Sequence, residues 1–287
     1  MLPRQELRRL VETALAEDLA WGDATVEAII PADLKARGRI VAREDGVLAG
    51  IDVAGEVFRA VDPSIEFQPM AADGDAVHRG HELASVRGSA AGILAGERVA
   101  LNFLQRLSGV SSLTSRYVHA VAGYRARIVD TRKTTPGLRT LEKYAVVVGG
   151  GTNHRQNLSD GILIKDNHLA ALATRGQGLA EVVATARRRA RHTQRIEVEV
   201  ETPDQAREAA EAGADLILLD NMSPEEMRRA VELVAGRALL EASGGVTLDR
   251  VAAIAATGVD LISVGALTHS ARALDIALDF AADLRQA

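Results

Sequence analysis

Apolar residues recur at helical spacing near the start of the chain. Leu7, Leu10, Val11, Ala14 and Leu15 share one side of an expected amphipathic helix over residues 3–20. The Trp-Gly-Asp sequence at residues 21–23 then ends the pattern, because glycine and aspartate favour turns over helix interiors. The chain is therefore expected to begin with one helix followed by a sharp stop.

From residue 38 to residue 95 the pattern changes to short strand-like runs separated by glycine, aspartate and proline. These runs cover residues 38–42, 47–49, 65–67 and 83–86. Around residue 95 a longer helical pattern begins, Ser108-Gly109 interrupts it, and a second helical stretch covers residues 111–122. We therefore expect a mixed α/β N-terminal domain over residues 1–108.

After Tyr124, short apolar runs alternate with helix-forming segments such as 203–212, 224–235 and 248–257. The apolar runs cover residues 127–130, 161–165, 196–200, 216–220, 239–242 and 261–265. Strands that are apolar on both faces and alternate with helices are typical of parallel βα units. The later strand ends are spaced by about 22 residues, the length of one βα unit of a barrel.

No Gly-x-Gly-x-x-Gly turn follows the first of these strands, which disfavours a doubly wound dinucleotide-binding sheet. We therefore predict a parallel α/β barrel over residues 109–269. The amphipathic pattern near the C-terminus predicts a helix within residues 270–287 that packs back on the first domain.

Composition narrows the possible functions. The 287 residues include no cysteine, which excludes disulfides, thiolate zinc sites and cysteine nucleophiles and agrees with a reducing cytoplasm. The chain has no apolar run of membrane-spanning length, and its first residues lack the apolar core of a secretory signal, so we expect a cytoplasmic protein. The net charge of -5 argues against general nucleic-acid affinity, so any anionic ligand must meet a local cluster of basic residues.

Such a cluster is expected where the barrel strands end. In parallel α/β barrels the active site gathers at the carboxyl ends of the strands. The residues found there are Asp130, Arg132, Lys133, Lys165, Asp166, Glu199, Asp220, Ser243, Gly244, Gly245, Gly265 and, shortly after, His269. A ring of opposite charges at one mouth indicates a site for a highly charged ligand and a metal.

The basic residues of this region suit carboxylates or phosphates. They are Arg132, Lys133, His154, Arg155 and Lys165, and guanidinium groups can bind such oxygens in pairs. Ser243-Gly244-Gly245 and Gly265 follow strands directly, where backbone amides can hold a phosphate. These features together predict a polyanionic ligand.

The acidic residues of this region leave more than one reading open. Glu199 and Asp220 could grip sugar hydroxyls or hold Mg²⁺, whereas either could instead form a structural ion pair with Lys165. Glu197, Glu199 and Glu201 alternate and so share one face of their strand. We take Glu199 as the functional member and Glu201 as a cap or salt-bridge residue, and leave His168 unassigned.

The chain also resembles the quinolinate phosphoribosyltransferase family, the carboxylating nicotinate-nucleotide pyrophosphorylases. The resemblance covers nearly the whole chain and rests on several ordered runs. They are Glu17-Asp18, Gly22 to Thr25, Glu97 to Gly109, Asp130-Thr131-Arg132-Lys133-Thr134-Thr135-Pro136-Gly137, Gly151 to Arg155, Ile164 to His168, Glu197 to Glu201, Leu219 to Met222, Glu241 to Gly245 and Ser263 to Gly265.

The resemblance implies a type II phosphoribosyltransferase-like fold, in which a mixed N-terminal domain packs on an incomplete α/β barrel. It implies a homodimer in which Arg98 completes the partner's site, and leaves open whether dimers form hexamers. Quinolinate would be bound by Arg132, His154, Arg155 and Lys165. Phosphoribosyl pyrophosphate and its Mg²⁺ would be served by Lys133, Glu199, Asp220, Ser243, Gly244, Gly245, Gly265 and His269.

The implied reaction transfers the phosphoribosyl group to quinolinate and releases pyrophosphate and carbon dioxide, giving nicotinate mononucleotide. Its catalytic residues would be Lys133, Lys165, Glu199 and Asp220, with Glu199 and Asp220 at the metal. Three alternatives stay open: a phosphoribosyltransferase for another pyridine carboxylate, a lyase barrel in which Lys133 or Lys165 forms a Schiff base, and a noncatalytic metabolite-binding protein.

Overall fold

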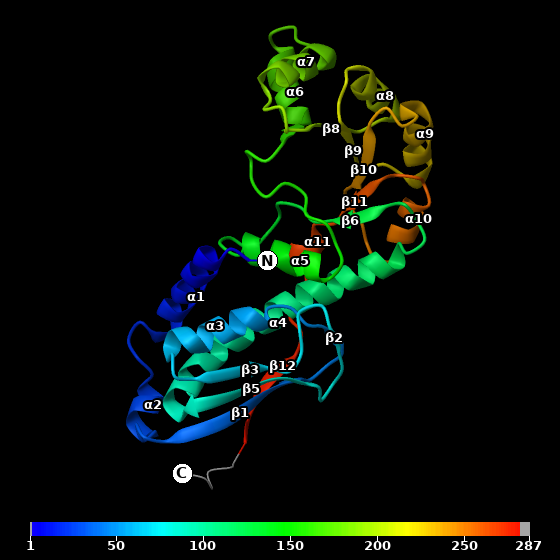
Figure 1. Cartoon of the computed structure of the whole chain (residues 1–287). Coiled ribbons are helices and arrows are strands. Elements are labelled where there is room, and N and C mark those ends of the chain that lie inside the picture. The colour runs from blue at the N-terminus through cyan, green and yellow to red at the C-terminus, as the bar shows by residue number, and fades with distance from the viewer. Residues whose placement is uncertain (1, 282–287) are drawn as a thin grey trace. The chain divides into compact units, whose positions relative to one another are not determined.

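The computed structural model describes residues 2–281, and the chain divides into two compact units. The first unit comprises Met1–Ser115, Thr134–Gly150 and Leu267–Ala287. The second comprises Arg116–Lys133 and Gly151–Ala266. Each unit is a separate arrangement of helices and strands, and the elements are labelled in Figure 1.

The first unit is built on a four-stranded antiparallel sheet in the order β12-β1-β5-β3, and it also contains a small two-stranded antiparallel sheet, β2-β4. Its elements are α1 (Arg4–Leu19), α2 (Ala24–Ile29), β1 (Lys35–Ala42), β2 (Gly46–Val47), α3 (Ile51–Val61), β3 (Glu66–Pro69), β4 (Ala76–Val77), β5 (Glu82–Ser89), α4 (Ala90–Ala120), α5 (Arg139–Val148) and β12 (Ile276–Ala281). The expected N-terminal helix and mixed α/β architecture are confirmed.

An apolar core holds the helices of this unit against the sheet. Phe58 on α3 stacks on Phe67 of β3 with ring centroids 5.9 Å apart, an arrangement typical of aromatic pairs in cores. Gly96 on α4 lies against the Phe58 ring, since a Cβ there would meet the ring at 3.0 Å. The small residue lets the long helix approach α3 closely.

Helix α4 runs without interruption through Ser108-Gly109, so the predicted break between two helices is wrong. The small residues are explained by close contacts instead of a turn. Ser108 Oγ accepts a hydrogen bond from the backbone N–H of Ala49 at 3.0 Å, and a Cβ on Gly109 would lie 2.0 Å from the carbonyl oxygen of Arg272. Glycine is required here because another backbone segment occupies the space of a side chain.

A buried ion pair ties α4 to α5 and to the loop before it. Glu142 on α5 is fully buried and lies 2.6 Å from Nη2 of Arg106 on α4. The same carboxylate accepts hydrogen bonds from the backbone N–H of Thr135 at 2.9 Å and from its hydroxyl at 2.7 Å. Glu142 therefore anchors the second half of the Thr-Arg-Lys-Thr-Thr-Pro run.

The predicted C-terminal helix is wrong where the structure describes the chain. Residues Ile276–Ala281 form β12, which pairs antiparallel with β1 over Arg37 to Ala42, and the remaining predicted residues, 282–287, lie outside the described residues. Ile276 is buried, and the Leu278 side chain covers Gly38 of β1. The unpaired edge of β1 overrides the local helical pattern, because pairing satisfies its backbone groups.

The second unit is a six-stranded parallel sheet in the order β6-β11-β10-β9-β8-β7. Its elements are β6 (Arg127–Val129), β7 (Ile162–Ile164), α6 (Asp166–Ala173), α7 (Leu179–Arg189), β8 (Ile196–Val200), α8 (Pro203–Glu211), β9 (Leu216–Asp220), α9 (Pro224–Val234), β10 (Leu239–Ser243), α10 (Val251–Ala255), β11 (Leu261–Ser263) and α11 (Ala266–His269), which continues into the first unit.

The order of this sheet is that of a barrel left open at one place. The first strand, β6, pairs with the last, β11, as in a closed barrel, whereas β6 and β7 stand at opposite ends of the order. All six predicted strands and the three predicted helices between them are present, so the expected incomplete parallel α/β barrel is confirmed. The carboxyl ends of its strands therefore point to one mouth.

Local sequence signals begin the helices between the strands. Thr202 and Gln205 form a capping box at α8, and Ser223 and Glu226 form another at α9. Proline follows the cap in both helices, at the position where its missing N–H costs nothing.

Across the described residues, we find no helix with the length and apolar character needed to cross a bilayer.

Candidate active site

The mouth of the open barrel encloses a cavity of about 640 Å³, which we call the site cavity. It gathers side chains and loops from the carboxyl ends of the strands. The predicted site residues that line it are Arg132, Lys133, His154, Arg155, Lys165, Glu199, Asp220, Ser243, Gly244 and Gly245. The expected convergence of opposite charges at one mouth is present.

Three predicted residues are not among those that line the site cavity. Gly265 lies two residues after the end of β11 and belongs to the second unit, but it does not line the cavity. Arg98 on α4 and His269 at the end of α11 belong to the first unit. Their parts in ligand binding remain predictions.

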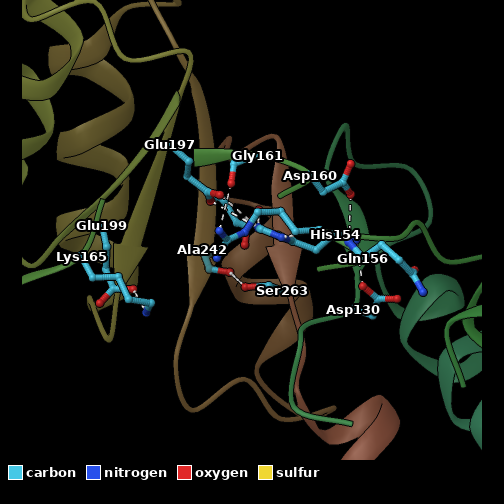
Figure 2. A network of polar contacts seen from close by, with 12 residues as sticks. Asp130, His154, Gln156, Asp160, Gly161, Lys165, Glu197, Glu199, Ala242 and Ser263 are labelled. Carbon is cyan, nitrogen blue, oxygen red and sulfur yellow. Dashed lines mark hydrogen bonds and ion pairs between the residues drawn. The ribbon is translucent and has the colours of Figure 1, made fainter. Parts of the chain in front are cut away.

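Lys165 and Glu199 form an ion pair within the site cavity, seen as a separate pair at the left of Figure 2. Lys165 directly follows β7, and Glu199 lies on the neighbouring strand β8. The Lys165 side chain is 45% exposed, so the pair faces the cavity and can exchange partners when an anion enters. Asp220, at the end of β9, instead accepts a hydrogen bond from Asn221 Nδ2 at 2.9 Å.

His154 lies against two buried carboxylates. Its Nε2 is 3.2 Å from Glu197 Oε2 on β8 and 3.6 Å from Glu241 Oε2 on β10, and Figure 2 shows Glu197 facing the imidazole. The side chains of Glu197 and Glu241 are 5% and 0% exposed. The backbone N–H of His154 donates to Asp130 Oδ1 at 2.8 Å, which fixes the residue to the end of β6.

Burial shifts the pKa values of these groups, upward for the acid and downward for the bases, because it disfavours the charged form. It raises the pKa of Glu241 to about 7, and the neighbouring negative charge of Glu197 acts in the same direction. Burial acts to lower the pKa of His154, but the hydrogen bond to Glu197 and the charge of Glu241 outweigh it and raise that pKa. Burial also lowers the pKa of Arg155, which lies close enough to Arg132 for their charges to repel.

The two buried carboxylates were missed as site residues by sequence reasoning. The sequence marks Glu241 only as part of a run that resembles the family. It gives no reason to prefer Glu197 over Glu199, because both share the same face of the strand. A signal was available, because a glutamate inside an apolar run such as 239–242 must find a partner when both faces of the strand are covered. The partner, His154, could be identified only from the folded chain.

Two residues left open by the sequence have local structural roles. His168 Nδ1 accepts a hydrogen bond from the backbone N–H of Lys165 at 2.9 Å, so His168 caps the start of α6. Glu201 is exposed, and its backbone N–H is capped by Gln205 Oε1 at 2.9 Å. His168 thereby holds the backbone at Lys165 in place.

The loop after β10 has a backbone conformation and a close neighbour that both call for glycine. Gly244 and Gly245 have φ angles of 87° and 55°, a region that favours glycine. A Cβ on Gly244 would lie 2.2 Å from Asn221 Oδ1. Together with Ser243, the two glycines line the site cavity, and a glycine loop of this kind is suited to an anion.

Two groups of carboxylates could interact with a metal. Glu199 and Asp220 supply hard oxygen ligands at the ends of adjacent strands and both line the site cavity, which fits Mg²⁺. Among the described residues, His154, Glu197 and Glu241 form the group of three whose ligand atoms all lie within 4.8 Å of one another. The second group lies deeper, and its imidazole nitrogen faces both carboxylates.

The raised pKa of Glu241 predicts a stability that depends on pH. Between pH 4.5 and about 7, the Glu241 carboxyl group is ionised in the unfolded chain but keeps its proton in the folded protein. This contribution is complete below pH 4.5 and is lost as the pH rises through about 7, and the raised pKa of His154 acts with the same sign. Over this window we expect the free energy of unfolding to fall by on the order of 1–3 kcal/mol.

Denaturant unfolding at a series of pH values measures this slope. Glu241→Gln, which keeps the shape of the side chain but cannot titrate, should flatten it. Glu201→Gln removes an exposed carboxylate from the end of the same region and should leave it unchanged. An identical slope in the wild-type protein and in Glu241→Gln would show that Glu241 does not retain its proton on folding.

Comparison with known proteins shows the family of the chain. Residues 23–108 match the family model for the quinolinate phosphoribosyl transferase N-terminal domain, and residues 110–279 match the model for its C-terminal domain. A protein of Bacillus subtilis (strain 168), named probable nicotinate-nucleotide pyrophosphorylase (carboxylating), is 44% identical over 96% of this chain and 93% of its own. A mitochondrial quinolinate phosphoribosyltransferase (decarboxylating) of Nicotiana glauca is 42% identical over 98% of this chain and 84% of its own.

The fold is also that of a solved relative. The crystal structure of NadC from Streptococcus pyogenes has a TM-score of 0.92 and 42% identity, over 98% of this chain and 99% of that one. The two family models together span most of the sequence, including both units described above. The chain therefore belongs to the quinolinate phosphoribosyltransferase family.

Proposed function

We propose that the chain transfers the phosphoribosyl group of phosphoribosyl pyrophosphate to quinolinate. The reaction releases pyrophosphate and carbon dioxide and forms nicotinate mononucleotide for NAD biosynthesis. The observation that carries this proposal is the content of the site cavity, where Arg132, Arg155 and Lys165 lie with Glu199, Asp220 and a glycine loop. A ligand with two carboxylates and a ligand with phosphates and a ribose match these groups.

The cations of the site cavity bind the two carboxylates of quinolinate in this proposal. Arg132 and Arg155 offer planar forks suited to bidentate carboxylate binding, and Lys165 offers a point charge that can leave Glu199 for the ligand. His154 completes the group at the inner end of the cavity. With three cations close together, a doubly charged ligand is favoured over a singly charged one.

The remaining residues of the cavity bind the phosphoribosyl donor. Ser243, Gly244 and Gly245 place backbone N–H groups at a phosphate, and Lys133 adds a positive charge from the opposite loop. Glu199 and Asp220 face the ribose between these contacts. Gly265 and His269 extend the donor site beyond the residues that line the cavity.

The reaction then depends on positioning and charge stabilisation. The pyridine nitrogen attacks the anomeric carbon of ribose as the bond to pyrophosphate breaks, and the carboxylates of Glu199 and Asp220 stabilise the positive charge that develops on the sugar. The ring nitrogen is then quaternary. Its positive charge stabilises the electron pair that stays on the adjacent ring carbon when the neighbouring carboxylate departs as carbon dioxide, and that pair then bonds a proton from solvent.

Glu199 and Asp220 would also hold Mg²⁺, directly or through water. The chemistry that Mg²⁺ supplies when bound is neutralisation of charge on the departing pyrophosphate. Lys133 acts on the same leaving group through its ammonium. The two carboxylates would supply the oxygen ligands that this cation prefers.

A Schiff-base lyase is the competing enzyme class, and the state of Lys165 disfavours it. An amine that attacks a carbonyl must be uncharged, whereas Lys165 is paired with the carboxylate of Glu199 as an ammonium ion is. Borohydride trapping with carbonyl substrates distinguishes the two classes. A covalent adduct on Lys133 or Lys165 would support the lyase and contradict the transferase.

We further propose a homodimer in the cytoplasm, in which Arg98 of one subunit completes the site of its partner. This assembly rests on the family resemblance and on the place of Arg98 in α4, outside the unit that forms the site cavity. Assembly of dimers into hexamers would use surfaces other than the one that carries Arg98. Neither nucleic acid nor a membrane has a part in the proposal.

The activity is tested by mixing the protein with quinolinate, phosphoribosyl pyrophosphate and Mg²⁺. We expect nicotinate mononucleotide, pyrophosphate and carbon dioxide in equal amounts, because one turnover yields one of each. Chromatography and capture of labelled carbon dioxide measure the products. Replacement of quinolinate by nicotinate tests the related alternative, since equal turnover of the two acids would point to another pyridine carboxylate as substrate.

The shared site is tested by mixing two inactive variants. Arg98→Ala removes the residue given to the partner, and Lys165→Ala removes a residue of the subunit's own cavity. In mixed dimers one site in principle carries both defects and the other carries neither, so we expect activity to recover after subunit exchange. If exchange is verified by differently tagged subunits and the mixture stays inactive, the sites are not shared.

A further inference from the structure

We propose that Glu241 and Glu197 are positioning residues for quinolinate binding: they hold the His154 imidazole so that His154 in turn orients Arg155 toward the substrate. The inference rests on the function proposed above and deepens it. It assigns a role to two carboxylates to which the proposed function gives none. All four residues belong to the second unit and meet within the open barrel.

The location of the carboxylates connects them to the site. A second cavity of about 350 Å³, which we call the opposite cavity, lies toward the amino ends of the strands and is lined by Arg127, Arg195 and Leu216 among others. His154, Arg155 and Glu241 line both cavities. The imidazole and the Glu241 carboxylate therefore form the floor that separates the site cavity from the opposite cavity.

Hydrogen bonds determine how the imidazole is held. The backbone N–H of Arg155 donates to His154 Nδ1 at 2.6 Å, so that nitrogen presents its lone pair. The hydrogen of the ring then lies on Nε2, which faces Glu197 Oε2 at 3.2 Å and Glu241 Oε2 at 3.6 Å. Both ring nitrogens are engaged within the protein, so His154 acts on quinolinate through Arg155 and not by a hydrogen bond of its own.

The negative charges of Glu197 and Glu241 also act on Arg155 in the site cavity. The guanidinium groups of Arg132 and Arg155 repel each other, and the negative charges of Glu197 and Glu241 offset this repulsion at Arg155. Arg155 Nη1 donates to the carbonyl oxygen of Gly161 at 3.1 Å, which leaves the buried Nε without a hydrogen-bond partner among the described residues. A carboxylate of the ligand can supply that partner.

The fold alone does not require these acids. They lie among buried apolar neighbours, Val198 and Val200 on β8 and Leu240 and Ala242 on β10. Buried charges are costly, and well-packed apolar residues often replace them without loss of stability. The cost of burying these two carboxylates at the floor of a ligand cavity is better explained by a role in orienting His154 and Arg155.

The test compares the Michaelis constants of Glu241→Gln and wild type for both substrates. The amide keeps the size of the side chain but loses the charge that faces His154 Nε2. We expect the KM for quinolinate to rise roughly tenfold or more, because the imidazole loses a buried charge 3.6 Å from Nε2, with little change in the KM for phosphoribosyl pyrophosphate. Glu201→Gln, an exposed change just after β8, should alter neither constant.

Equal changes in the KM values for the two substrates would overturn the positioning role and indicate a general structural effect. No change in either KM would also overturn it, because Glu241 would then have no part in substrate binding. An inactive wild-type protein would instead overturn the proposed function, and direct titration of quinolinate into the wild type and Glu241→Gln would then test the inference without turnover. Weaker binding to the variant supports the inference, and equal binding contradicts it.

A spectroscopic measurement on the wild type decides the matter should Glu241→Gln fail to fold. In a protein with nitrogen-labelled histidines, the resonances lost in His154→Gln identify the ring. We expect Nδ1 to be unprotonated and Nε2 to carry hydrogen. Hydrogen on Nδ1, or a stoichiometric metal ion on Nε2, would contradict the arrangement and indicate a different use of the two carboxylates.

Discussion

The attraction between buried carboxylates and the basic groups above them is the interaction on which the site depends. Glu197 and Glu241 lie inside a parallel sheet, where unpaired charge is costly, and His154 is the group they meet. Arg132 and Arg155 lie close enough to repel each other, and both line the site cavity. Without the negative charges of Glu197 and Glu241, the repulsion between Arg132 and Arg155 would favour conformations in which these side chains point toward solvent when no ligand is bound.

The open barrel makes this arrangement possible. A closed barrel of six strands would fill its interior with side chains, whereas here β6 and β7 are not neighbours in the sheet. The segment that carries His154 and Arg155 lies in the chain between these two strands and bonds to Asp130 at the end of β6. The chain thus brings a loop, rather than a strand, to the charged interior.

Much of this was predictable from the sequence, and the exceptions share a cause. Strands that are apolar on both faces alternate with helices, and their ends share one mouth, so Lys165, Glu199 and Asp220 could be expected to converge. The continuation of α4 through Gly109, the strand pairing of Leu278 and the meeting of Glu241 with His154 could not. Each depends on a contact between segments distant in sequence, where the local pattern admits more than one structure.

The central claim is that the site cavity recognises two carboxylates at once, and calorimetric binding tests it most directly. Quinolinate and nicotinate differ by one carboxylate and are matched ligands for the purpose. The account predicts that quinolinate binds the wild type roughly tenfold or more tightly than nicotinate, and that Arg132→Ala removes most of this preference. Equal affinity of the wild type for the two acids would contradict it.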